Sequence, residues 1–141
     1  MAASFHCDIA SAKDRIFSGE IESLVAAGSL GDLGIFPGHA PLLTALIPGP
    51  VRIVMVGGEE DIYYVSGGFL EVQPGTVNIL ADMAIRADDV DEATAEKARQ
   101  DAEAAIANQD AEFEYSRAAS QLAEAAAQIR TIQQLRKKLG G

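Results

Sequence analysis

Side chains that could do chemistry are few in this chain, and they are scattered. His6 and Cys7 are neighbours, and because neighbouring residues of a strand point to opposite faces, they cannot ligate one metal ion together. His39 could act as a base, but no nucleophile motif adjoins it. The carboxylates at 59–61 follow a Gly-Gly pair, where a solvated turn explains them. The sequence therefore predicts no catalytic residue, no metal site and no cofactor.

The sequence also contains no phosphate-binding loop, because the Gly-Gly pairs are not followed by the Lys and Ser or Thr of that motif. Cations gather instead near the C-terminus, at Arg130, Arg136, Lys137 and Lys138. Two readings remain open for them. They could complement the negative end of a helix dipole, or they could form a basic tip that binds an acidic partner surface.

Composition excludes several classes of function. The chain has 141 residues, 48% of them hydrophobic, which is enough for one ordinary domain or a small one with an appendage. A formal net charge of -10 opposes binding to nucleic acid, and to anionic lipid by charge alone. A single cysteine, no signal-like start and no apolar run long enough to span a bilayer predict a soluble, cytoplasmic protein without direct membrane insertion.

The elements that would position these residues change in type at Arg86. All five prolines precede it, and glycines there separate short apolar runs. Beyond it, Ala, Glu, Gln, Arg and Lys dominate, which are good helix formers. We therefore expect an α+β protein with a β domain over 1–86 and a helical domain over 87–141.

Short strands are expected throughout the first region. Phe5, Cys7 and Ile9 alternate with polar residues, which is typical of a strand with one buried face. Residues 31–49 hold four glycines, three prolines and a run of large apolar residues, which predicts a compact, partly buried segment without a regular helix. The other expected strands are 16–17, 21–27, 51–56, 62–66, 69–73, 77–81 and 83–85. About ten short strands with such turns indicate a β-sandwich.

Two helices are expected in the second region. Asp89 with Glu92 three residues later resembles a capping box and predicts a helix start, and 108–110 break the helical pattern. The first helix offers an apolar stripe of Val90, Ala98, Ala102, Ala105 and Ile106. The second has two rows spaced by seven: Tyr115, Leu122 and Ile129, and Ala118, Ala125, Ile132 and Leu139. These rows predict an antiparallel helical hairpin.

The predicted hairpin should be weakly held. Because alanine buries little area, at about 0.8 kcal/mol per CH₂, we expect the two helices to separate at modest cost.

The segment 31–44 resembles the signature of the ε subunit of bacterial F-type ATP synthases. It reads Gly31-Asp32-Leu33-Gly34-Ile35 and, after Phe36, Pro37-Gly38-His39-Ala40-Pro41-Leu42-Leu43-Thr44. Similar segments lie at 8–9, 11–12, 17–19, 48–49, 66–68, 71–75, 81–82 and 84–86. The likeness covers nearly the whole chain, and it implies the same order of folds, an N-terminal β-sandwich followed by a helical hairpin.

The resemblance implies a non-catalytic rotor subunit in the central stalk, peripheral on the cytoplasmic face of the bacterial inner membrane. Such a subunit binds the γ subunit and the ring of c subunits, and it couples proton flow to ATP synthesis. Its helices can extend to the α and β catalytic subunits and inhibit ATP hydrolysis. In that state Arg130, Arg136, Lys137 and Lys138 would meet acidic catalytic subunits.

The same resemblance places individual residues of the 31–44 segment. Asp32 falls at the position that faces the c-ring, and His39 at a position near γ. Pro41, Leu42 and Leu43 belong to the same expected interface.

The sequence departs from the family pattern at the motif that binds ATP in some members. Some members of the family bind ATP through a motif of Ile or Leu, Asp, two variable residues, Arg and Ala at the start of the first helix. Here Val90, Asp91 and Ala95 match, but Thr94 replaces the arginine, so one phosphate-pairing cation is missing. The sequence therefore predicts weak or absent ATP binding.

Two alternatives remain beside the stalk subunit. One is an ATP-sensing regulatory subunit whose hairpin closes on nucleotide. The other is a small hydrolytic or sugar-modifying β-sandwich enzyme, which would need a carboxylate pair that the sequence does not supply at identifiable spacing.

Overall fold

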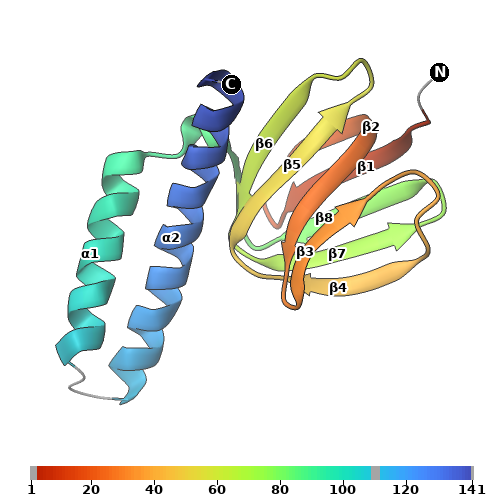
Figure 1. Ribbon diagram of the computed structural model, residues 1–141. Helices are drawn as coiled ribbons and strands as arrows, with labels where there is room; N and C mark the ends of the chain where they lie inside the picture. Colours follow the sequence, from red (N-terminus) through yellow and green to blue (C-terminus); the bar gives the residue numbers. More distant parts are fainter. Residues whose placement is uncertain (1–2, 109–111, 141) are drawn as a thin grey trace.

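The structure is a computed structural model that describes residues 3–108 and 112–140. Nine strands occur in the described residues, where about ten were expected, and two helices follow them (Figure 1). The strands are β1 (Phe5–Ser11), β2 (Arg15–Gly28), β3 (Gly31–Ile35), β4 (Leu42–Leu46), β5 (Gly49–Met55), β6 (Glu60–Val65), β7 (Gly68–Gln73), β8 (Thr76–Ala81) and β9 (Ala84–Arg86). A 3₁₀ turn, Ala87–Asp89, leads to α1 (Glu92–Asn108) and α2 (Glu112–Gly140). The expected fold class is confirmed.

The strands form a sandwich of two layers that share β2. The first layer contains β4, β7, β8, β1 and the first half of β2, and the second contains β3, the second half of β2, β5, β6 and β9. A register shift between Ile21 and Ser23 lets β2 bend from one layer into the other. The expectation of two strands, 16–17 and 21–27, was wrong, because Ser18 and Gly19 pair with Asp8 and Cys7 inside the continuous β2.

Alternating residues of both layers fill the core, as Cys7 and Ile9 of β1 and Leu24 of β2 do. Cys7 is completely buried, which confirms that it packs as a small apolar residue. Burial raises the pKa of its thiol to about 12. Because the thiolate is the reactive form, this cysteine has a structural role only.

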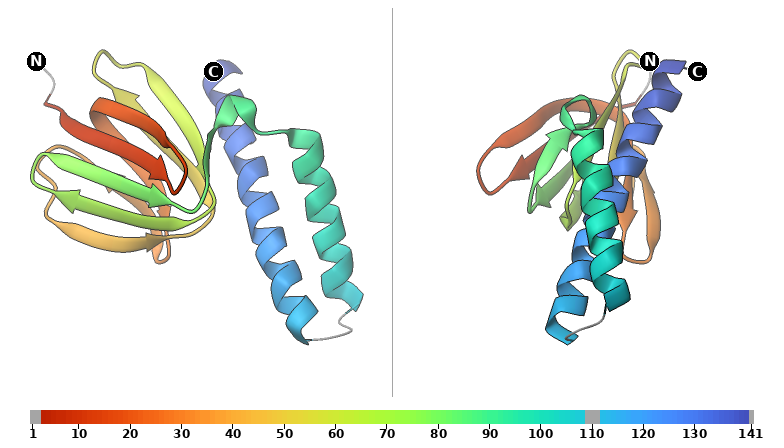
Figure 2. Two further views of the ribbon diagram at one scale, coloured as in Figure 1. Left: turned by 180° about the vertical axis from the view of Figure 1, so that it is seen from behind. Right: turned by 90° about the vertical axis from the view of Figure 1, so that its left-hand side faces the viewer.

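The helix α2 lies between α1 and the sandwich (Figures 1 and 2). Ala118, Ala125 and Ile132 are buried, as the row with a spacing of seven predicted. Leu139 of the same row is 75% exposed, because Arg136 already contacts Glu92 at the first residue of α1 and Leu139 lies beyond it.

On α1 the stripe is narrower than expected. Ala95 and Ala102 are buried and Ile106 is half-buried, but Ala98 and Ala105 are exposed. The side chain of Tyr115 and the break at 109–110 lie outside the described part of the chain.

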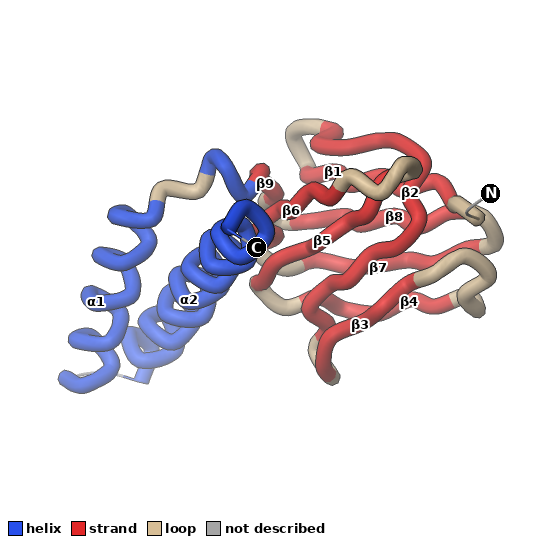
Figure 3. The backbone as a smooth tube through the Cα atoms, turned by 45° about the horizontal axis from the view of Figure 1, so that its top comes forward, coloured by secondary structure: helices blue, strands red, loops and turns tan. Residues whose placement is uncertain are grey.

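A second buried stripe on α2 was missed from the sequence. Ala127 and Thr131 are fully buried, on the side of the helix opposite the row that contacts α1. This side packs on the outer face of β5 and β6 (Figure 3). The Thr131 hydroxyl donates to the Ala127 carbonyl at 2.8 Å, so its proton is satisfied within the helix. Alanine and threonine give no strong apolar signal, which is why the pattern did not reveal this contact.

The turn into β7 gives a test of the sandwich. Gly68 has φ 137°, and a Cβ there would lie 2.2 Å from the Leu80 carbonyl oxygen. Gly75 has φ 79° but open space around it. We expect Gly68→Ala to lower the free energy of unfolding by about 3 kcal/mol or more, and Gly75→Ala by about 1 kcal/mol. Urea denaturation of both variants measures this, and equal losses would contradict the backbone clash.

Candidate functional site

The outer face of the first layer carries an apolar patch. Strand register aligns Ala45, Phe69, Leu80 and Ala10 side by side across four strands. Phe69 is 56% exposed, Leu80 61% and the nearby Leu43 69%. We call Leu43, Phe69 and Leu80 the apolar patch. Large apolar side chains gathered on a surface are typical of a protein–protein contact.

Polar residues border the patch on the same face. The next row across the layer is Glu71, Asn78, Asp8 and Ser18. The apolar patch and Arg15, Asp8, Glu71 and Asn78 together line a groove of about 370 Å³. This surface is therefore apolar on one side and charged on the other, which suits a partner of mixed character.

His6 lies in a polar cluster on this face that the sequence analysis did not identify. Its Nε2 is 3.3 Å from Ser18 Oγ and 3.3 Å from Asp8 Oδ2, and its Nδ1 is 3.5 Å from Glu20 Oε1. The Ser18 hydroxyl and the His6 ring hold the pKa of Asp8 below its usual value. Because the Asp8 carboxylate competes for the same ring nitrogen, His6 is poorly placed to act as a base toward Ser18. Cross-strand register could have revealed the cluster, since His6 pairs with Glu20 and Asp8 with Ser18.

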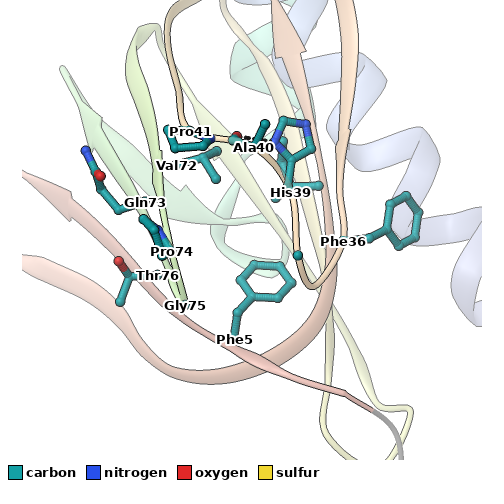
Figure 4. Close-up of a pocket in the computed structure, with 12 residues that line it drawn as sticks. Phe5, Phe36, His39, Ala40, Pro41, Val72, Gln73, Pro74, Gly75 and Thr76 are labelled. Atoms are coloured by element: carbon teal, nitrogen blue, oxygen red, sulfur yellow. Dashed lines mark hydrogen bonds between the residues drawn. The ribbon is translucent and has the colours of Figure 1, made fainter.

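The residues expected from the 31–44 segment do not meet in one site. His39 is exposed in the loop between β3 and β4, where its Nδ1 donates to the Ala40 carbonyl at 2.6 Å. It lines a hollow of about 330 Å³ with Pro41, Phe5 and Phe36, and the Phe36 ring points away from the other labelled side chains (Figure 4). Leu42 packs against the core, while Leu43 points outward into the apolar patch.

Asp32 lies apart from that loop, in β3 beside the turn after β2. It is exposed, and the turn next to it presents Leu30, whose side chain is completely exposed. Asp32 also lines a small cavity of about 140 Å³ with Arg52 of β5 and Gln134 of α2. The Asp32 carboxylate therefore lies near the junction of the sandwich and the hairpin.

The basic residues of α2 do not form a free tip in this structure. Arg130 Nη2 donates to the Pro48 carbonyl at 3.3 Å, and Lys138 Nζ donates to the Glu60 carbonyl. Arg136 pairs with Glu92 at the start of α1. Lys137 is exposed. Three of the four cations thus fasten α2 to the sandwich or to α1.

The start of α1 uses its polar residues for capping. The Thr94 amide donates to Asp91 Oδ1 at 3.3 Å, and the Thr94 hydroxyl donates to Asp91 Oδ2 at 2.9 Å. These bonds lower the pKa of Asp91. The cap is therefore Asp91, not Asp89 as the sequence suggested, because Asp89 ends the preceding 3₁₀ turn. Ala95 is buried in the hairpin and Val90 is half-buried.

The groove between the two helices does not favour a nucleotide. It measures about 290 Å³ and is lined by Ala98, Asp101, Gln121, Glu124, Ala125 and Gln128. Its two carboxylates would repel a phosphate group. Among residues 3–108 and 112–140, no three His, Cys, Asp or Glu side chains are arranged to hold a metal ion.

The architecture defines a class of protein, a β-sandwich that presents one outer face and covers the other with a helical hairpin. Comparison with known proteins identifies the family. Residues 4–87 match the family described as ATP synthase, Delta/Epsilon chain, beta-sandwich domain, and residues 88–133 match the long alpha-helix domain of the same chain. The chain belongs to the delta/epsilon chain family of ATP synthases.

Individual relatives agree with this assignment. An ATP synthase epsilon chain from Chromohalobacter salexigens is 63% identical over 136 residues, which is 96% of each chain. A chain in the mitochondrial ATP synthase structure of Euglena gracilis, which shows OSCP, F1 and the c-ring, superposes with a TM-score of 0.75 at 22% identity, over 97% of this chain and 82% of that one. A chain in the central stalk and c-ring structure from Tetrahymena thermophila superposes with a TM-score of 0.65 at 14% identity, over 90% and 95%. The resemblance drawn from the sequence is thereby confirmed.

Nucleotide binding is directly testable. Because Thr94 lies where the ATP-binding motif has arginine and Asp91 is engaged in the cap, we expect no micromolar affinity for ATP. Isothermal titration calorimetry of the full chain with ATP, with and without Mg²⁺, measures it. Micromolar affinity in either titration would contradict the prediction.

Proposed function

We propose that the chain is a non-catalytic subunit of the central stalk of an F-type ATP synthase, which helps to couple proton flow to ATP synthesis. Residues 1–86 would bind the stalk partners, and residues 87–141 would regulate ATP hydrolysis. The observation that carries the proposal is the difference between the two outer faces of the sandwich. The second layer is covered by α2, whereas the first layer exposes the apolar patch.

The γ subunit is the partner that we assign to the apolar patch. Burying a large apolar side chain contributes roughly 1.5–3 kcal/mol, so Leu43, Phe69 and Leu80 could anchor a stable contact. The charged wall formed by Asp8, Arg15 and Glu71 would set its orientation. His39 and Pro41, at the hollow beside Phe5, would extend the same contact.

The c-ring is assigned to the turn between β2 and β3. Leu30 and Asp32 are exposed there, and the neighbours from Euglena and Tetrahymena come from assemblies that contain a c-ring. No helix among the described residues combines the length and apolar character needed to cross a membrane. We therefore propose a peripheral position, on the cytoplasmic face of the bacterial inner membrane, reached through the ring.

The hairpin is assigned the inhibitory role, through the α and β catalytic subunits. To reach acidic surfaces there, Arg130, Arg136 and Lys138 would leave Pro48, Glu92 and Glu60. Lys137 is already exposed. On α2 itself the residues in contact with the sandwich, Ala127 and Thr131, are small and contribute little area to the contact. The ATP-sensing alternative finds no support in the acidic groove between the helices.

The assignment of γ to the apolar patch can be tested by introducing charged side chains into the patch. Phe69→Glu combined with Leu80→Glu should abolish co-purification with γ, because two carboxylates would have to be desolvated in the contact. Val56→Glu is the matched control, since Val56 is also 56% exposed but lies in the turn between β5 and β6. Retention of γ by the double variant would overturn the assignment, as would equal loss in the control.

The hairpin can be tested by removal. A chain that ends at Arg86 should still assemble with γ and the c-ring, because the strands and their core precede that residue. ATP hydrolysis by the assembled enzyme should rise. Unchanged hydrolysis in an enzyme that contains the truncated chain would show that the inhibitory assignment is wrong.

A further inference from the structure

The outward face of β6 is buried only because α2 covers it. Tyr63 and Val65 point into the sandwich core, whereas Ile62 and Tyr64 alternate with them and lie outside that core cluster. Both outward residues are nevertheless buried, with Tyr64 completely so. The contact between α2 and β6 accounts for this burial. If the hairpin left the sandwich, Tyr64 would therefore meet water.

The Tyr64 hydroxyl has no hydrogen-bond partner within the described part of the chain, although it is buried. Its neighbour Tyr63 differs, since the Tyr63 hydroxyl accepts a bond from Arg86 Nη1 at 3.4 Å. Glu124, Gln128 and Arg130 of α2 lie near Tyr64, and burial raises its pKa to about 12, with the charge of Glu124 acting in the same direction. The hydroxyl is thus neutral, and no bond to it, including one from the nearby Gln128, meets normal geometry.

An unpaired buried hydroxyl opposes the packing that buries it. In the docked hairpin Tyr64 loses its bonds to water without gaining one from the protein, and release of α2 restores them. We propose that the Tyr64 hydroxyl is a built-in release element, which weakens the docking of α2 on the sandwich and so raises the population of the undocked hairpin.

The Tyr64 hydroxyl opposes attractions that are made by both sides of the α2 contact. On α2 the contact is made by the buried Ala127 and Thr131, and Arg130 and Lys138 bond to carbonyls of the sandwich. On β6 the contact covers Ile62 and the Tyr64 ring. A buried hydroxyl without a partner shifts an equilibrium by about tenfold. Such a shift offsets part of what the burial of Ile62 and the Tyr64 ring contributes to docking.

The test compares two conservative substitutions in the full chain. Tyr64→Phe removes the hydroxyl and keeps the ring, so it should reduce the undocked population about tenfold. Tyr63→Phe is the matched control, because the Tyr63 hydroxyl lies on the other side of β6 and bonds to Arg86.

Two measurements report the undocked population. Hydrogen exchange of the amides in 124–138 detects rare release of α2 from the sandwich. Spin labels at Val56→Cys and Leu139→Cys, both exposed positions, report the distance between the hairpin end and the sandwich.

A third variant keeps the proposal falsifiable. If Gln128 satisfied Tyr64, Tyr64→Phe would loosen the hairpin, and Gln128→Ala would loosen it to the same extent. The proposal expects tighter docking in Tyr64→Phe whether residue 128 is Gln or Ala. Unchanged or faster exchange in Tyr64→Phe would overturn it, as would an equal effect of Tyr63→Phe.

The consequence for ATP hydrolysis rests on the proposed function, and it can be separated from the docking result. In the assembled enzyme, Tyr64→Phe should increase hydrolysis, because a hairpin held on the sandwich cannot reach the catalytic subunits. Tighter docking without a change in hydrolysis would leave the release element standing and would refute the inhibitory role. Unchanged docking would refute the release element, whatever hydrolysis does.

Discussion

The position of α2 between α1 and the β5–β6 face is the contact on which the rest of the structure depends. One side of this helix packs on α1 through Ala118, Ala125 and Ile132, and the other packs on the sandwich through Ala127 and Thr131. The small residues on α2 allow both neighbours to approach closely, and larger side chains such as Ile132 and Tyr64 are buried in the two contacts. The helix is therefore fixed in place by its two neighbours jointly.

This arrangement gives the two layers of the sandwich different roles. The second layer has its outer face covered by α2, whereas the first layer leaves the apolar patch uncovered. A partner bound to Phe69 and Leu80 would not compete with α2, because the two contacts lie on opposite faces. Permanent attachment and reversible regulation can then coexist on one small domain, which a single shared surface would not permit.

Much of this fold could be predicted from residue patterns, because the signals were local. Proline and glycine located the turns, and the row of Ala118, Ala125 and Ile132 located the contact with α1. Local signals failed where partners are distant in sequence. Ser18 and Gly19 looked like a turn but pair with β1 inside the continuous β2. The helix cap was missed for a different reason: Asp89 and Asp91 both precede α1, and only the local geometry shows that Asp91 makes the bonds. The apolar patch and the His6 cluster depend on register between strands, which periodicity alone does not supply.

The acceptors that the sandwich offers to the α2 cations are neutral, which bears on the proposed release of the helix. Arg130 and Lys138 donate to the carbonyls of Pro48 and Glu60, which carry no formal charge. A cation gains less from a neutral carbonyl than from a carboxylate, and so it gives up less when it leaves. An acidic partner surface therefore offers these residues a stronger contact than the one they lose. Acidic acceptors on β5 and β6 would have held the helix more firmly and removed that difference, so neutral acceptors favour the release that we propose.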